Sequence, residues 1–145
     1  MVTNRIIGLD FGDKTIGVAV SLNGTVATGI TTILRENPEA IRQSLKELKT
    51  ILRKYEAGTI VLGYPLHLSG ETSQRCKKTL EFKEKLMRYF KSITVELWDE
   101  RLSTAAVTRT YEGHMKDFKK HVDEMAAVYI LQGYLDFKAN NSIKD

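Results

Sequence analysis

The segment at residues 6–21 restricts the fold more than any other part of the chain. It consists of two apolar runs, residues 5–10 and 15–21, joined by a short turn that contains Gly12. Apolar runs on both sides of such a turn predict two paired strands. Asp10 stands where the first run ends. A carboxylate is costly to bury inside a strand, but at a strand end it can face an opening and bind a cation, so Asp10 is a candidate metal ligand.

The following residues predict a third strand, a helix and two more strands. Residues 25–33 form the third strand after Asn23-Gly24, a dipeptide typical of hairpin turns. Asn37 and Pro38 are interpreted as the cap and first residue of an amphipathic helix that ends at Gly58. The apolar runs at residues 59–63 and 93–98 are expected to be strands of the same sheet.

Three more helices are expected. They cover residues 71–90, residues from Ser103 or Thr104 to about 111, and residues 123–137. The apolar face of the first is predicted to comprise Cys76, Leu80, Leu86, Met87 and Phe90. A basic loop that contains Lys116, Lys119 and Lys120 is expected to precede the last helix.

The order βββαβαβαα predicts a mixed α/β architecture. Its five-stranded sheet would be antiparallel in the first three strands and parallel where helical crossovers follow. This is the order of the ribonuclease H-like fold, in which carboxylates at strand ends and on a flanking helix converge at the carboxyl edge of the sheet.

The composition is that of a globular protein and argues against a membrane-spanning, secreted or disulfide-bonded one. The 145 residues are expected to form one domain over residues 1–145, with 42% hydrophobic residues and no apolar run near the roughly 18 residues of a membrane span. The first strand follows Met1 too closely for a signal peptide, and the single cysteine, Cys76, excludes an internal disulfide. We therefore expect a cytoplasmic protein. The formal charge of +4 is compatible with a polyanionic partner without indicating one by itself.

Carboxylates at three places could share metal ions. Asp10 ends the first strand, Asp99 or Glu100 ends the fifth, and Asp123 begins the last helix. Taken singly, each acid is better explained as part of a solvated turn or as a helix cap. Taken together, they match the carboxylate set that phosphodiester cleavage by two metal ions requires.

The choice between Asp99 and Glu100 depends on reach. The fifth strand is expected two positions from the first, about 9–10 Å away, which favours the longer glutamate side chain. Other chemistries have less support, because His67, His114, His121 and Cys76 lack metal-ligand spacing and the serines lack a nucleophile elbow.

Four motifs, in order along the chain, resemble the YqgF family. They are GLDFGDKTIGVA from Gly8, VLGYP from Val61, WDERLST from Trp98, and DEMAA from Asp123 with ILQGYL from Ile130. Members of this family are described as pre-16S rRNA nucleases and, under the name RuvX, as Holliday junction resolvases. The resemblance spans nearly the whole chain.

The resemblance implies a ribonuclease H-like nuclease that depends on Mg²⁺ or Mn²⁺, with two ions expected, and that matures the 5′ end of small-subunit ribosomal RNA. Asp10, Glu100 and Asp123 match the acidic positions that would hold the metal. Compared with the related RuvC resolvases, Gly63-Tyr64-Pro65 replaces an acid at the end of the fourth strand, and Ala126 replaces a second helical aspartate.

We therefore predict a metal-dependent endonuclease whose partner is precursor ribosomal RNA. Lys14, Arg101, Lys119 and Lys120 are expected to contact phosphates, although a structural ion pair with a neighbouring acid is the default explanation for Arg101. The alternatives are a resolvase of four-way DNA junctions and a non-catalytic nucleic-acid-binding protein. A monomer or weak homodimer without membrane association is expected.

Overall fold

The computed structural model describes residues 5–37, 40–65, 74–100 and 115–144, with side chains omitted for residues 115–123 and 141–144. Several predicted features lie outside the described residues. They are the placement of Pro38, the contacts of Arg101 and the helix near residues 103–111.

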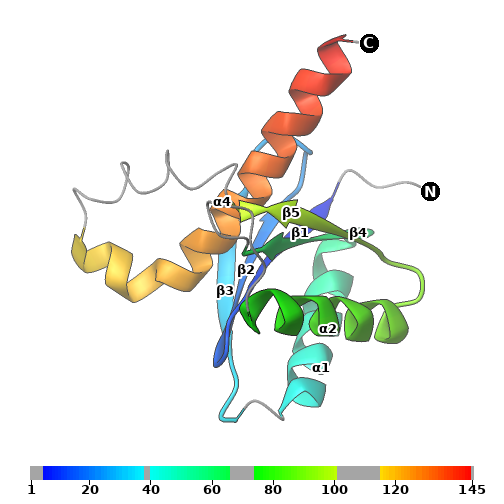
Figure 1. Ribbon diagram of the computed structural model, residues 1–145. Helices are drawn as coiled ribbons and strands as arrows, with labels where there is room; N and C mark the ends of the chain where they lie inside the picture. Colours follow the sequence, from blue (N-terminus) through cyan, green and yellow to red (C-terminus); the bar gives the residue numbers. More distant parts are fainter. Residues whose placement is uncertain (1–4, 38–39, 66–73, 101–114, 145) are drawn as a thin grey trace.

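A five-stranded mixed sheet forms the centre of the molecule, in the order β3-β2-β1-β4-β5 (Figure 1). The strands are β1 (Ile6–Phe11), β2 (Thr15–Ser21), β3 (Thr28–Leu34), β4 (Thr59–Tyr64) and β5 (Thr94–Asp99). Strand β1 pairs antiparallel with β2 and parallel with β4, and β4 pairs parallel with β5. This topology confirms the predicted ribonuclease H-like fold, including the place of β5 two positions from β1.

Helices cover both faces of the sheet (Figure 1). One face packs against α1 (Ile41–Tyr55) and α2 (Gln74–Tyr89), and the other packs against α4 (Met115–Lys144), which extends beyond the sheet. None of the helices in the described part of the chain has a stretch long and apolar enough to cross a membrane.

Alternation along the strands divides the core into two clusters. Leu9 and Leu62 are fully buried on the side of α1 and α2, whereas Val61 and Trp98 pack against α4. Fully burying a large apolar side chain stabilises a fold by about 1.5–3 kcal/mol, so both helical layers contribute to holding the sheet. Because side chains alternate along a strand, the same two faces also decide which polar side chains lie toward α4 and which lie toward α1 and α2.

The connection between β2 and β3 is longer than the predicted hairpin turn. The Asn23 side chain accepts hydrogen bonds from the N–H groups of Thr25 and Val26 at 2.8 and 3.0 Å, and Gln132 of α4 accepts one from Ala27 at 2.9 Å. Because side chains satisfy these backbone groups, β3 begins at Thr28, and the predicted start at residue 25 is wrong.

Helix α1 is shorter at both ends than predicted. The cap position is Ala40, which makes no side-chain cap hydrogen bond, so the assignment of Asn37 as the cap is wrong. At the other end the left-handed residue is Glu56, with φ 52°, and the helix ends before Gly58. The Arg5 guanidinium donates to the Tyr55 carbonyl and to the Glu56 carboxylate, at 3.2 and 3.0 Å, which helps hold this end.

The buried face of α2 is rotated from the predicted one. Cys76 and Leu86 are buried as expected, but Leu80 and Met87 are 41% and 51% exposed. Thr79 and Phe82 are buried instead. The Thr79 hydroxyl donates to the Arg75 carbonyl at 2.8 Å, which satisfies it inside the core, and Phe82 stacks on Phe11 at 4.1 Å between ring centroids.

Helix α4 begins at Met115, eight residues earlier than predicted. The expected basic loop is wrong, because Lys116, Lys119 and Lys120 all belong to this helix. Residues 115–122 contain neither glycine nor proline and are rich in lysine, a good helix former. Nothing local therefore prevents the helix from extending through them.

Candidate metal and nucleic-acid site

Asp10 lies near the carboxyl end of β1, on the face of the sheet that α4 covers. The strand alternation shows this, because Gly8, two residues earlier, lies directly beneath Ala127 and Leu131 of α4. A Cβ added to Gly8 would approach the Leu131 Cβ to 2.7 Å and the Ala127 carbonyl oxygen to 3.2 Å. This close packing holds the strand that carries Asp10 against the helix.

The Glu100 carboxyl group lies on the same face, above Gly63 of β4. Its Cδ atom would be 3.2 Å from a Cβ added to Gly63. The parallel register pairs Leu9 with Leu62, so one residue further along Asp10 is level with Gly63. Gly63 therefore leaves room on the strand between Asp10 and Glu100 into which the glutamate side chain reaches.

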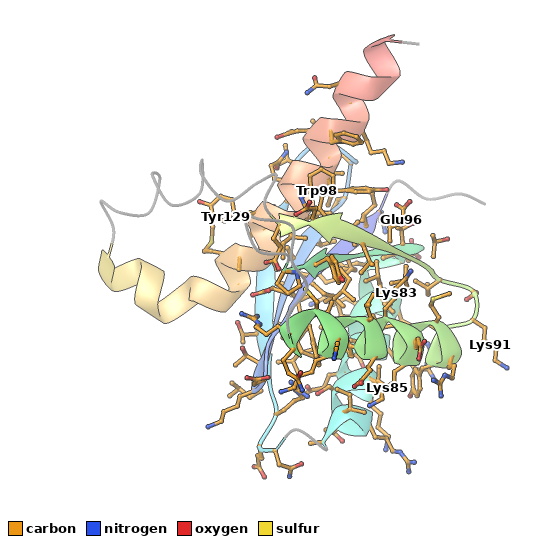
Figure 2. The ribbon with its side chains drawn as sticks, viewed as in Figure 1. Lys83, Lys85, Lys91, Glu96, Trp98 and Tyr129 are labelled. Atoms are coloured by element: carbon orange, nitrogen blue, oxygen red, sulfur yellow. The ribbon has the colours of Figure 1, made fainter. Side chains whose placement is uncertain are left out.

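Asp99 faces the other way. It is the last residue of β5, in register with Tyr64, and by strand alternation it shares the side of Leu97, which packs in the core of α1 and α2. Trp98, by contrast, packs with α4 (Figure 2). The structure thus brings Glu100, and not Asp99, to the face of Asp10, which favours the longer carboxylate as the candidate ligand.

The surroundings raise the pKa of Glu100 from 4.5 to about 7. Burial of the carboxyl group is the largest cause, followed by the neighbouring Asp10 carboxylate, with a smaller effect from Asp99. The Arg75 guanidinium acts in the opposite direction. Two carboxylates that disfavour each other's ionisation in a half-buried place are a feature of sites that bind a cation or transfer a proton.

Sequence reasoning missed Arg75 and the role of Gly63. Arg75 is the second residue of α2, whose crossover begins where β4 ends, and it is close enough to Glu100 to lower its pKa. The signal that could have found it is topological. In a parallel β–α crossover the helix starts at the carboxyl edge of the sheet, where the candidate carboxylates were expected.

Asp123 lies on α4, within the helix and not at its start. Tyr134 donates a hydrogen bond to Glu96 of β5, whereas Ile130 lies over Gly63, closer to the carboxyl edge. Earlier residues of α4 therefore lie progressively toward that edge, and the backbone of Asp123 is one turn before Ala127. Its side chain, like those of Lys119 and Lys120, is outside the described residues.

Lys14 is exposed in the turn between β1 and β2, directly after the strand that carries Asp10. Arg35 stabilises this turn through hydrogen bonds to its backbone. Its guanidinium, in a residue that is 5% exposed, donates to the carbonyl oxygens of Gly12 and Asp13 and lies 4.7 Å from the centre of the Phe11 ring. The turn that follows Asp10 is thus fixed by hydrogen bonds as well as by strand pairing.

The residues present suit a hard divalent cation. Asp10 and Glu100 offer carboxylate oxygens, the donors that Mg²⁺ and Mn²⁺ prefer, and a cation between them would offset the repulsion that raises the pKa of Glu100. Among the described side chains, no group of three or more His, Cys, Asp or Glu residues is placed to hold a metal. A third protein ligand would therefore have to come from the remainder, which includes the side chain of Asp123.

Comparison with known proteins identifies the family of this chain. The sequence model of the RuvX family, described as Holliday junction resolvase, matches residues 4–137. Two curated relatives carry the name "Putative pre-16S rRNA nuclease". The one from Agathobacter rectalis is 43% identical, over 94% of this chain and 98% of its own length. The one from Clostridioides difficile is 44% identical, over 97% of this chain and 100% of its own.

Solved structures share the fold at much lower identity. Thermus thermophilus RuvC in complex with Holliday junction substrate superposes with a TM-score of 0.60 at 11% identity, covering 92% of this chain and 96% of RuvC. The yeast mitochondrial Holliday junction resolvase Ydc2 superposes with a TM-score of 0.53 at 12% identity, covering 98% of this chain and 82% of Ydc2. At these identities the likeness concerns the fold alone. By the family match and the two close relatives, this chain belongs to the RuvX family, as its four sequence motifs predicted.

Proposed function

We propose that this protein is a metal-dependent endonuclease that hydrolyses phosphodiester bonds in the 5′ region of precursor 16S ribosomal RNA. The observation that carries the proposal is the placement of the Glu100 carboxyl group over Gly63, on the face and at the level of Asp10. The names of the relatives supply the substrate. Such a role would place the protein in the cytoplasm.

Asp10, Glu100 and Asp123 would hold Mg²⁺ or Mn²⁺, with two ions expected. When bound, the ions would activate water and stabilise the leaving oxygen of the phosphodiester. The protein's own residues orient the substrate. Arg75 beside Glu100 and Lys14 in the turn after Asp10 are placed to contact phosphates at the edge of the site.

Lys119 and Lys120 are proposed to contact the RNA further out, from the first turns of α4. Their placement in a helix, where a loop was predicted, would give these contacts a regular spacing. Arg101 directly follows Glu100 in the sequence and stays a candidate phosphate contact.

The decisive test is cleavage of a 16S rRNA precursor that carries its 5′ extension, with Mg²⁺ or Mn²⁺ present. Asp10→Asn and Glu100→Gln should each lower the cleavage rate by at least about 100-fold, because each removes a charged metal ligand. Glu47→Gln, which removes an exposed carboxylate of α1 away from the site, is the matched control and should cleave like wild type. Equal cleavage by wild type and Asp10→Asn would refute the assignment.

A four-way DNA junction is the second candidate substrate, favoured by the family description and by the fold shared with RuvC. Junction resolution requires two symmetric cuts and therefore a dimer. Competition between the precursor RNA and a junction for the same enzyme separates the two substrates, and a protein that stays monomeric at assay concentration argues against the junction. Binding of RNA without any metal-dependent cleavage would instead support a non-catalytic binder.

A further inference from the structure

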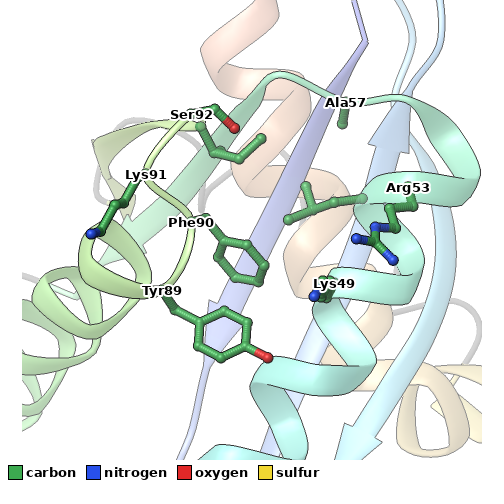
Figure 3. Close-up of a pocket in the computed structure, with 9 residues that line it drawn as sticks. Lys49, Arg53, Ala57, Tyr89, Phe90, Lys91 and Ser92 are labelled. Atoms are coloured by element: carbon green, nitrogen blue, oxygen red, sulfur yellow. The ribbon is translucent and has the colours of Figure 1, made fainter.

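A basic cavity lies between the carboxyl-terminal ends of α1 and α2, on the sheet face opposite the candidate carboxylates. Its volume is about 440 Å³, and none of its nine lining residues is acidic. Lys49 and Arg53 extend from α1 and Tyr89 from α2 into the space between the two helices, while Lys91 projects outward (Figure 3). This places cationic groups and an aromatic ring around one recess.

The floor of the cavity is apolar and buried. Leu52, Ala57 and Phe90 line it and are between 5% and 8% exposed, so they belong to the core. Tyr89 stands at the rim, 40% exposed, with its ring 4.8 Å from that of Phe90 in an edge-on arrangement. A partly exposed ring supported by a buried one offers a flat surface that a base can stack on.

Two smaller cavities continue along the same pair of helices toward the candidate site. The middle one shares Tyr89 with the first and is lined by the cations Arg42, Lys85 and Arg88, again without an acid. The third shares Lys85 with the middle one and, unlike the other two, is lined by acids as well as cations: Glu81, and Asp13 in the turn after Asp10. We call the three together the α1/α2 groove.

The ion pairs in the groove are weak enough to be exchanged for phosphates. Lys78 pairs with Asp13 at 3.3 Å and Arg88 pairs with Glu84 at 3.4 Å, and every one of these side chains is more than half exposed. Exposed pairs of this kind contribute about 0–1 kcal/mol. A phosphate that replaced either carboxylate would find the cation already in place.

We propose that the α1/α2 groove binds single-stranded nucleic acid, with phosphates on Lys49 and Arg53 and a base stacked on Tyr89. The recess is of the size of a small-ligand pocket, which suits one nucleotide and excludes a duplex. The run of shared cavities toward Asp13 favours a continuous strand over an isolated anion. The inference rests on the proposed nuclease function, because the nucleic-acid strand in the groove would be a continuation of the RNA that is cleaved at the candidate metal site.

The test is fluorescence anisotropy with a labelled, unstructured RNA of about 12 nucleotides, in EDTA so that no cleavage occurs. Lys49→Glu with Arg53→Glu should weaken binding at least tenfold and reduce the slope of log K against log salt by about 1.4, since each lost phosphate contact on a single strand contributes about 0.7. Tyr89→Ala should weaken binding about tenfold with an unchanged slope.

The matched control reverses Lys46 and Lys54 to Glu. Both are exposed on α1 and line none of the three cavities. Because two cations again become two glutamates, the net charge changes by the same amount as in the Lys49/Arg53 variant. The RNA affinity of this control should stay within about threefold of that of wild type. Circular dichroism melts establish that all variants fold, and crosslinking of a 4-thiouridine strand should map to the peptide that contains Tyr89.

Three outcomes would overturn the proposal: equal losses in the control and the Lys49/Arg53 variant, no effect of Tyr89→Ala, or displacement of the RNA by inorganic phosphate or AMP at comparable affinity. Failure of the nuclease proposal is distinguishable, because it is measured as cleavage with metal present, whereas the groove is measured as RNA binding in EDTA. If cleavage is absent but the variants weaken binding as expected, the groove stands without the nuclease. If cleavage requires Asp10 and the groove variants bind normally, only the groove is refuted.

Discussion

At the scale of single residues, Glu100 is a carboxyl group held in surroundings that disfavour its charge. Its carboxyl group is half-buried over Gly63 and close to Asp10, and both circumstances disfavour its charged form. The folded protein therefore holds the Glu100 proton more tightly than the unfolded chain does, with a pKa of about 7 against 4.5. Without metal, ionisation of this group opposes folding.

The consequence is a loss of stability as pH rises. Glu100 stabilises the fold fully below its unfolded pKa of 4.5, and this contribution is lost between pH 4.5 and about 7. The shift corresponds to about 3 kcal/mol. Glu100→Gln, which cannot ionise, should therefore be more stable than wild type by up to about 3 kcal/mol near pH 8 in a chelator, and nearly equal to it near pH 4.

Urea unfolding at the two pH values measures this difference. Glu84→Gln, whose carboxylate is exposed on α2, should change the free energy of unfolding by less than about 0.5 kcal/mol at either pH. A gap between Glu100→Gln and wild type that did not vary with pH would contradict the assigned environment.

At the scale of elements, the contact of α4 with β1 and β4 depends on two glycines. A Cβ at Gly8 would meet the Leu131 Cβ and the Ala127 carbonyl oxygen, which belong to the helix framework and cannot rotate away. A Cβ at Gly63 would lie 2.4 Å from the Ile130 Cδ1, the end of a side chain that is 2% exposed. The helix can approach the sheet this closely only because both strand positions lack side chains.

Gly63→Ala should therefore destabilise the protein by about 1–3 kcal/mol through overpacking. Ile130→Val removes the Cδ1 atom that the new methyl group would strike. The double variant should be more stable than the sum of the two single effects predicts, which thermal unfolding of the four proteins in a double-mutant cycle measures.

Metal affinity should not recover in that double variant. The added Cβ would still lie 3.2 Å from the Glu100 Cδ, displacing the carboxyl group from the side of Asp10. Titration with Mn²⁺, followed by calorimetry, separates the two effects. Full recovery of metal binding by Ile130→Val would show that Gly63 serves packing alone.

At the scale of the whole molecule, the candidate metal site and the most cationic part of the α1/α2 groove lie on opposite faces of the sheet. The candidate carboxylates Asp10 and Glu100 lie toward α4, and the cations of the α1/α2 groove lie on the other side. The two regions meet at the turn after Asp10. A polyanionic strand and a divalent cation can therefore bind at once without competing for the same groups.

Divalent metal should stabilise the whole fold by mass action. A ligand of the native state at about 100 times its Kd adds about 2.7 kcal/mol to the free energy of unfolding. Mn²⁺ should therefore raise the Tm of wild type at pH 8 and leave that of Asp10→Asn nearly unchanged, as differential scanning fluorimetry can measure. NaCl at the same ionic strength serves as a control for general ionic effects, and equal shifts of wild type and Asp10→Asn with Mn²⁺ would contradict the proposed ligands.

Much of the architecture could be predicted from the sequence because its signals are local. Apolar runs and turn residues identified the strands, and the alternation of strands with helices after β3 led to the parallel pairing of β1, β4 and β5. The same local pattern put Asp10 and Glu100 at the ends of strands two positions apart. The family assignment also followed from contiguous motifs, which need no knowledge of packing.

The tertiary structure alone decided which faces meet. The buried side of α2 depends on Phe82 stacking against Phe11, and the choice between Asp99 and Glu100 depends on which side of β5 faces α4. Likewise, Gly63 acquires its role only because Ile130 and Glu100 approach it from two other elements. Propensity and periodicity describe a segment's own backbone, whereas these features arise from contacts between residues far apart in the chain.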